Sequence, residues 1–212
     1  MTVKISNLDD NKTVMDMFPV GMYARHNILT HDENEILMRK VQKMREVFGI
    51  GNTEEWLSGK YSPDNCFKIS CLTESLEFQP LIGKVTEAVH ECARYYGSFG
   101  EYECTNGWYN VYTSGRYQEF HIHPGNIFSA VYFLQVPDGA PGITFRRPFT
   151  SMLPPKNMVN ADGSATNTTW NNEIITAPAK TGTVVIFRSD LMHSVLPTKF
   201  EGERVTVALN YK

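Results

Sequence analysis

Two stretches in the first half of the chain carry apolar residues at helical spacing. The first stretch presents these apolar positions: Ile36, Leu37, Val41, Met44, Val47 and Phe48. Steps of three and four residues place them on one face of a helix, which we expect to pack against the core. Thr30, Asp32 and Asn34 are candidate N-caps, and Gly49 and Gly51 mark the end of the helix.

A second helix is predicted from Phe78 to Tyr96. Its apolar face is formed by Leu81, Ile82, Val85, Val89, Cys92 and Tyr96. Pro80 is tolerated in the first turn of a helix, and Gly97 is a typical terminator. His90 lies inside this helix, and we assign it a structural role rather than a metal-binding one.

Beyond Gly100 the pattern changes to short strand-like runs separated by turns. The runs cover residues 102–113, 127–136, 143–146, 173–176, 184–188 and 205–211. Turns such as Ser114-Gly115 and Pro141-Gly142 separate them. Many short strands at this spacing are typical of a β sandwich or barrel. Two preceding helices that cover one face of a sheet would give an α+β, mainly β, layer arrangement.

Three other segments show less regular patterns. Residues 14–28 read as short strands or an irregular entry segment, and residues 52–71 are polar and rich in turn formers. Residues 150–172 are rich in Asn, Thr and Pro and predict a long loop. Loops of this length often serve as lids or binding loops, and an insertion without function is an equal alternative.

The composition fits one intracellular domain. A chain of 212 residues, 42% of them hydrophobic, can bury one sizeable core. The net charge of −3 and the lack of a basic cluster argue against nucleic acid or an anionic membrane as a partner. No apolar run approaches the roughly 20 residues that span a bilayer, and the acidic start is unlike a secretory signal. The four cysteines form no Cys-x-x-Cys pair, which favours reduced thiols: Cys66, Cys71, Cys92 and Cys104.

A pair of histidines is the centre of the candidate chemistry. His121 and His123 are separated by one residue, so an extended backbone over 120–123 would project both rings from one face of a strand. Pro124-Gly125 then ends the strand. Imidazole is a good ligand for iron, zinc, copper or nickel. Glu119, two residues before the first histidine, is a lower-ranked candidate ligand.

Two features near the end of the chain extend this picture. His193 follows a buried-looking strand, in a short connection before Val195. Arg204 and Thr206 are two residues apart and therefore share one face of the last strand. An arginine fork beside a hydroxyl is a good receptor for a carboxylate, although an ordinary exposed strand pair is an alternative.

In their order along the chain these features resemble the Fe(II)- and 2-oxoglutarate-dependent oxygenases, and most closely the small members found in bacteria and phages. The matching positions are Asn110, Tyr112, Gly115, His121-Ile-His123-Pro-Gly125, Ser129 to Leu134, Pro178 to Gly182, Phe187, His193-Ser-Val195 and Arg204 to Asn210. The resemblance covers residues 104–212, with looser likeness before that. It implies one domain over residues 1–212 with its core at 104–212. The implied fold is a double-stranded β-helix, of the jelly-roll or cupin-like kind, with the N-terminal helices packed on one sheet.

The resemblance also implies cofactors, roles and a reaction. His121 and His193 match the two histidine ligands of Fe(II), and His123 stands where the family usually has a carboxylate. Arg204 matches the residue that grips the distal carboxylate of 2-oxoglutarate, with Thr206 and Tyr112 beside it. The implied enzyme uses O2 to hydroxylate a small-molecule or peptide substrate and releases succinate and CO2. It would act in the cytoplasm, with a phage-encoded enzyme in a bacterial host as one option.

Several alternatives stay open at this point. A metal site with three neutral histidines is more positive by one charge than the usual site with two histidines and one carboxylate. Zinc also suits three histidines with an open position. A cupin-type metalloenzyme that does not use 2-oxoglutarate is one rival, and a non-catalytic β-sandwich binding module is another. Tyr132, Asn126, Arg146 and the 150–172 loop are candidates to line the substrate pocket. The oligomeric state is open, with a homodimer as one option.

Overall fold

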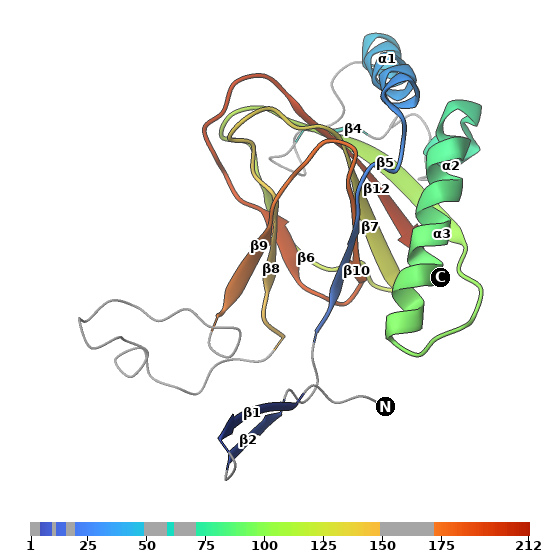
Figure 1. Ribbon diagram of the computed structural model, residues 1–212. Coiled ribbons are helices and arrows are strands. Elements are labelled where there is room, and N and C mark those ends of the chain that lie inside the picture. Colours follow the sequence, from blue (N-terminus) through green and yellow to red (C-terminus); the bar gives the residue numbers. More distant parts are fainter. Residues whose placement is uncertain (1–4, 10–11, 16–19, 49–58, 62–70, 149–171) are drawn as a thin grey trace.

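The computed structural model describes residues 5–9, 12–15, 20–48, 59–61, 71–148 and 172–212 (Figure 1). The helices are α1 (His31–Phe48), α2 (Cys71–Glu74) and α3 (Gln79–Tyr95), with a 3-10 turn at Leu76–Phe78. The strands are β1 (Ile5–Asp9), β2 (Lys12–Met15), β3 (Met22–Arg25), β4 (Gly59–Tyr61), β5 (Cys104–Tyr112), β6 (Gln118–His121), β7 (Phe128–Gln135), β8 (Ile143–Arg146), β9 (Ile174–Ala177), β10 (Val184–Arg188), β11 (His193–Val195) and β12 (Arg204–Tyr211). The predicted mainly β architecture with few helices is confirmed.

Two antiparallel sheets form the body of the protein. A six-stranded sheet has the order β3-β10-β7-β12-β5-β4, and a four-stranded sheet has the order β6-β11-β8-β9. From β5 onward the chain passes back and forth between the two sheets, so that strands adjacent in sequence mostly lie in different sheets. Apolar residues from both sheets meet in one core cluster: Phe133, Val185 and Phe187 from the larger sheet, and Ile143, Phe145 and Ala177 from the smaller one. The inner faces of the sheets therefore pack on each other.

The outer face of the six-stranded sheet is covered by α1 and α3 (Figure 1). Alternate residues of β7 and β12 join the helices in the main core cluster, among them Tyr132, Leu134, Val207 and Leu209. On α1 the predicted apolar face is buried at Leu37, Val41 and Met44, but Ile36 is 47% exposed because it lies at the edge of that face. On α3 the buried positions include Leu81, Val85 and Val89. The expectation that the N-terminal helices pack on one sheet is confirmed.

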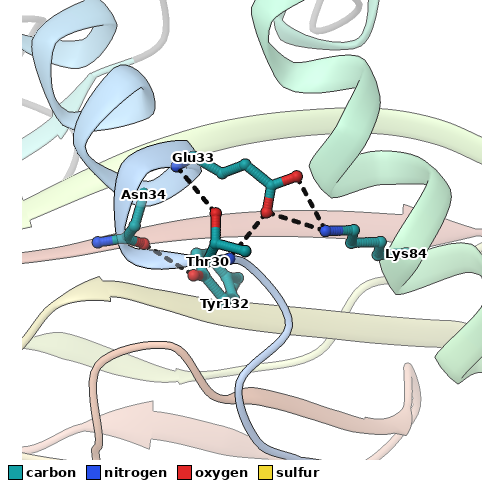
Figure 2. Close-up of polar contacts among 5 residues, drawn as sticks. All are labelled: Thr30, Glu33, Asn34, Lys84 and Tyr132. Carbon is teal, nitrogen blue, oxygen red and sulfur yellow. Dashed lines mark hydrogen bonds and ion pairs between the residues drawn. The ribbon is translucent and has the colours of Figure 1, made fainter.

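The start of α1 is fixed to both α3 and the sheet (Figure 2). Thr30 and Glu33 form a reciprocal cap, in which each backbone N–H donates to the other's side chain, at 2.8 and 3.3 Å. Lys84 of α3 donates to the same Glu33 carboxylate. Asn34 donates to the carbonyl of Leu134 and accepts the hydroxyl proton of Tyr132 at 2.7 Å. Thr30 is therefore the cap, while Asn34 lies in the first turn and anchors the helix to the sheet.

That contact overturns the expectation that Tyr132 lines a pocket. The side chain is fully buried and points toward α1, on the opposite face of β7 from Phe133. Strand alternation explains the difference: the apolar residues at 130, 132 and 134 share the helix-covered face. His90 is structural, as predicted, because its Nε2 accepts the backbone N–H of Tyr102 at 3.1 Å.

Several predicted boundaries shift by one or two residues. The runs at 143–146 and 184–188 coincide with β8 and β10, whereas the run at 102–113 shortens to β5. Gly97 follows α3 with φ of 73°, the left-handed conformation expected of a terminator. Cys92 and Cys104 are free thiols, and burial raises the pKa of each to about 11. The long loop predicted at 150–172, apart from its last residue, and Cys66 lie outside the described residues. Among the described helices none is long and apolar enough to cross a membrane.

Candidate metal centre

Two of the three histidines are brought together by strand pairing. His121 ends β6 and His193 begins β11, and their α-carbons are register partners in the antiparallel pair. Their ring centroids lie 4.3 Å apart. The structure thus places His193 in a strand, where the sequence had suggested a short connection. Residues directly opposite each other in antiparallel strands project from the same face, so the register of this pair determines that the two rings meet.

The third histidine reaches the same place from a loop. β6 ends at His121, so the predicted extended run does not continue to His123. The backbone N–H of His123 instead donates to the carbonyl of Ser189 at 2.9 Å, and the chain turns at Gly125 with φ of 80°. The ring of His123 lies with its centroid 5.0 Å from that of His121 and 5.1 Å from that of His193. The three potential ligand nitrogens all lie within 4.8 Å of one another.

Backbone carbonyls fix the tautomers of two of these rings. His121 Nδ1 lies 2.7 Å from the carbonyl oxygen of Glu119, and His193 Nδ1 lies 2.9 Å from that of Leu191. A carbonyl can only accept, so both Nδ1 atoms carry the proton and donate. The lone pair of each neutral ring is then on Nε2, and this arrangement is the usual way in which proteins orient a metal-binding imidazole.

The surroundings keep His193 neutral. Its side chain is 5% exposed, and burial together with the neighbouring His121 and His123 lowers its pKa to about 3. The hydrogen bond to the Leu191 carbonyl opposes this shift but does not cancel it. Neutral imidazole is the form that binds a metal ion.

The cluster contains no carboxylate among the described residues. The lower-ranked candidate Glu119 is exposed, and its carboxylate accepts a hydrogen bond from Gln118 instead. The donor set is therefore three imidazoles, which suits iron and also zinc.

A buried arginine faces the interior between the sheets. Arg204 is 1% exposed, and none of its three guanidinium nitrogens has a hydrogen-bond partner in the described structure. Its Cζ lies 4.9 Å from the ring centroid of Tyr112 and 5.2 Å from that of Phe133. Burial lowers the pKa of Arg204 to about 10, so the side chain stays charged at neutral pH. An unpaired buried cation is costly, and a carboxylate ligand would supply the missing counter-charge and acceptors.

Aromatic side chains connect this arginine with the histidines. Phe133, beneath Arg204, belongs to the same apolar cluster as Phe187. The ring of Phe187 lies 4.6 Å from that of His193. The guanidinium and the ring of His193 therefore both pack against the apolar cluster between the sheets. Thr206, predicted to help Arg204, is buried two residues along the same face of β12.

The other two residues predicted to line the substrate pocket, Asn126 and Arg146, lie in different surroundings. Asn126 lies in the turn after His123, where its side chain accepts a hydrogen bond from Thr105 Oγ1 at 3.2 Å. Arg146 is exposed and projects from the opposite face of β8 to Phe145. The sequence analysis missed Trp108, whose ring lies 5.5 Å from that of His123. Trp108 lies on the same face of β5 as Tyr112, four residues later, and this even spacing could have identified it from the sequence.

Comparison with known proteins adds a family and a fold. Residues 106–210 match the model of a family described as "Putative 2OG-Fe(II) oxygenase". No curated protein sequence matches the chain.

Solved structures with a similar fold include three enzymes. A prolyl-4-hydroxylase of Pseudomonas putida is 15% identical with a TM-score of 0.55, over 91% of this chain and 92% of that one. HygX of Streptomyces hygroscopicus, solved with nickel and 2-oxoglutarate bound, is 13% identical with a TM-score of 0.61, over 91% and 82%. The α-ketoglutarate-dependent epimerase SnoN from nogalamycin biosynthesis is 13% identical with a TM-score of 0.63, over 91% and 76%. At these identities the likeness concerns the fold.

Proposed function

Through residues 106–210 this chain belongs to the 2OG-Fe(II) oxygenase family, and we propose that it is an Fe(II)- and 2-oxoglutarate-dependent dioxygenase that hydroxylates its substrate and releases succinate and CO2. The observation that carries this proposal is the combination of two features in the described structure. One is a cluster of three imidazoles, and the other is a buried guanidinium without a hydrogen-bond partner in the described structure. A cupin-type metal enzyme would give Arg204 no task, and a binding module would explain neither feature.

We propose that the two sheets form a double-stranded β-helix within one domain that spans residues 1–212. Supporting this, consecutive strands from β5 onward mostly alternate between the six-stranded and the four-stranded sheet. The similarity to the three solved oxygenase folds extends over 91% of the chain. The predicted core at 104–212 contains all the histidine ligands and the arginine.

His121, His123 and His193 would hold Fe(II), which when bound supplies the oxidising chemistry with O2 and 2-oxoglutarate. The protein's contribution is to present three neutral nitrogens in a fixed arrangement. Two of them are oriented by the carbonyls of Glu119 and Leu191. Because no carboxylate of the described residues joins them, the site is one unit more positive than the family's usual ligand set, which favours an anionic cosubstrate beside the metal.

Arg204 would bind the distal carboxylate of 2-oxoglutarate. The fork presents its donors from within a hydrophobic wall, so water does not compete for them. Tyr112 and Phe133 pack against the guanidinium and restrict its orientation. The hydroxyl of Thr206, on the same strand face, is the further donor proposed for this carboxylate. Donors that are already oriented in this way position a cosubstrate without any further reorganisation of the protein during the reaction.

The primary substrate would be a small molecule or a peptide. The structurally similar proteins include a prolyl-4-hydroxylase and the epimerase SnoN from nogalamycin biosynthesis. Trp108 beside His123 would form part of the substrate-facing wall, because its ring lies 5.5 Å from that of His123 and the residue is only partly buried.

Thermal unfolding with Co(II), a redox-stable substitute for Fe(II), tests the proposal. A ligand that binds only the folded protein raises Tm by an amount set by its concentration relative to Kd. The dioxygenase responds to Co(II) and gains a further increase when 2-oxoglutarate is added. A response to Co(II) alone would favour the cupin-type enzyme, and a response to neither would favour the binding module.

A further inference from the structure

A chain of four polar side chains, three of them buried and one half-buried, crosses the inner face of the six-stranded sheet. We call these residues the inner polar cluster: Asn106 on β5, Ser129 on β7, Asn210 on β12 and Ser189, which directly follows β10. Ser129 Oγ–H donates to Asn210 Oδ1 at 2.8 Å, and Asn210 Nδ2 donates to Asn106 Oδ1 at 2.9 Å. Since Ser129 has already used its only proton, the 2.8 Å contact between the serine hydroxyls runs from Ser189 to Ser129. The chain of donors therefore has one direction.

The register of the sheet builds this cluster. Asn210 is the register partner of both Asn106 and Ser129 on the two neighbouring strands. Ser129, Ser189 and Asn210 are at most 4% exposed. A buried polar group without a partner destabilises the folded protein, so each of these side chains is held in the one arrangement that satisfies its neighbours.

Ser189 connects the inner polar cluster with the metal centre. Its carbonyl accepts the backbone N–H of His123 at 2.9 Å, and its own N–H donates to Ile127 at 2.9 Å. Two residues later, the carbonyl of Leu191 accepts from Nδ1 of His193. The turn at 189–191 thus holds the backbone of one histidine and the ring of another.

We infer that the inner polar cluster is a positioning network for His123, acting through Ser189. His121 and His193 are placed by strand pairing, but His123 lies in a loop beyond the end of β6. Its backbone contact to Ser189 takes the place of a strand partner. The Ser189 hydroxyl, anchored in the sheet through Ser129 and Asn210, sets where that carbonyl lies. The inference rests on the proposed function, because it takes His123 to be a metal ligand.

Co(II) affinity without 2-oxoglutarate, measured by titration of the d–d absorption, tests this inference in the full chain. Ser189→Ala removes the anchoring hydroxyl, and Ser129→Ala removes the next one, so the second variant serves if the first does not fold. We expect both to weaken Co(II) binding by a factor of about 10 to 100, as the loss of outer-shell partners of metal ligands does, and to alter the d–d band.

Thr183→Val is the matched control. Thr183 is a buried hydroxyl at the opposite end of β10, bonded to Nδ1 of His26 at 2.9 Å. Its loss should lower Tm without changing Co(II) affinity. Unchanged affinity in Ser189→Ala and Ser129→Ala, or an equal loss in the Thr183→Val control, overturns the positioning role. If the wild-type chain itself binds no Co(II), the proposed function fails as well, so the two failures are distinguishable.

Discussion

His121 and His193 are register partners across the β6–β11 pair, and their ring centroids lie 4.3 Å apart. Each ring donates its Nδ1 proton to a carbonyl two residues earlier in the chain, at Glu119 and Leu191. These two hydrogen bonds fix the orientation of both rings and therefore the direction of both Nε2 lone pairs, which the side-chain rotamers alone would not determine. Metal binding should therefore depend on these two residues first.

His121→Ala and His193→Ala should each abolish specific Co(II) or Fe(II) binding. Removing a ligand should cost more than the roughly 10–100-fold loss of affinity that follows removal of an outer-shell partner. Isothermal titration of the purified variants measures this. Glu119→Gln is the control: its exposed carboxylate lies on the same strand, and its substitution should leave the affinity unchanged. A strong loss in Glu119→Gln would restore that carboxylate as a ligand.

Arg204→Met should remove the response to 2-oxoglutarate while leaving metal binding intact. The guanidinium is buried without a partner, so an apolar side chain of similar length should also leave the ligand-free protein at least as stable as the wild type. Thermal unfolding with Co(II), with and without 2-oxoglutarate, measures both effects. Arg45→Met, which breaks the ion pair between Arg45 of α1 and Glu203, should keep the full 2-oxoglutarate response. An undiminished response in Arg204→Met would contradict the assignment.

The metal-free protein should lose stability as the pH falls from about 6.5 toward 3. Burial, with His121 and His123, lowers the pKa of His193 to about 3 from 6.5. Between these values the unfolded chain carries a proton on this ring and the folded chain does not. The free energy of unfolding therefore rises with pH, by up to ~1.4 kcal/mol per pH unit for one proton. Urea unfolding with a chelator present measures the slope, and His193→Gln should reduce it. Equal slopes would show that another group dominates.

Tyr132→Phe should destabilise the fold by about 1 kcal/mol, because it removes the hydrogen bond to Asn34 that fastens α1 to the sheet (Figure 2). Its affinity for Co(II) and 2-oxoglutarate should stay at the wild-type value, since the side chain points away from the metal centre. Urea unfolding and the Co(II) titration together test this. A change in ligand affinity without a change in stability would return Tyr132 to the pocket.

The hydrophobic pattern predicted the elements that carry clear apolar runs or faces. α1 and α3 were found because their apolar positions recur at helical spacing, and β8 and β10 were found because each is a short, mostly apolar run near turn formers. β6 was expected as an extended run over 120–123, two residues later than the strand that forms, and β11 was expected as a short connection, since each is short and carries site residues in place of an apolar pattern. The histidine cluster was nevertheless predictable, because His-x-His and a later histidine keep their order regardless of where the strands end.

Contacts between distant residues could not be predicted in the same way. Tyr132 was a candidate pocket residue, and its strand is apolar on both faces, so only the position of α1 shows which face it occupies. Ser189 carries no local signal at all. Its importance comes from a carbonyl that meets His123 and a hydroxyl that meets Ser129, 66 and 60 residues away along the chain.

The most direct test of the central claim is an anaerobic titration of the Fe(II)-loaded protein with 2-oxoglutarate, followed by visible absorption. If three histidines and Arg204 form a working cosubstrate site, the weak charge-transfer band of the chelated complex appears and saturates. The band should require much more 2-oxoglutarate in Arg204→Met. Iron that binds without producing the band would contradict the dioxygenase account and favour a metal enzyme that does not use 2-oxoglutarate.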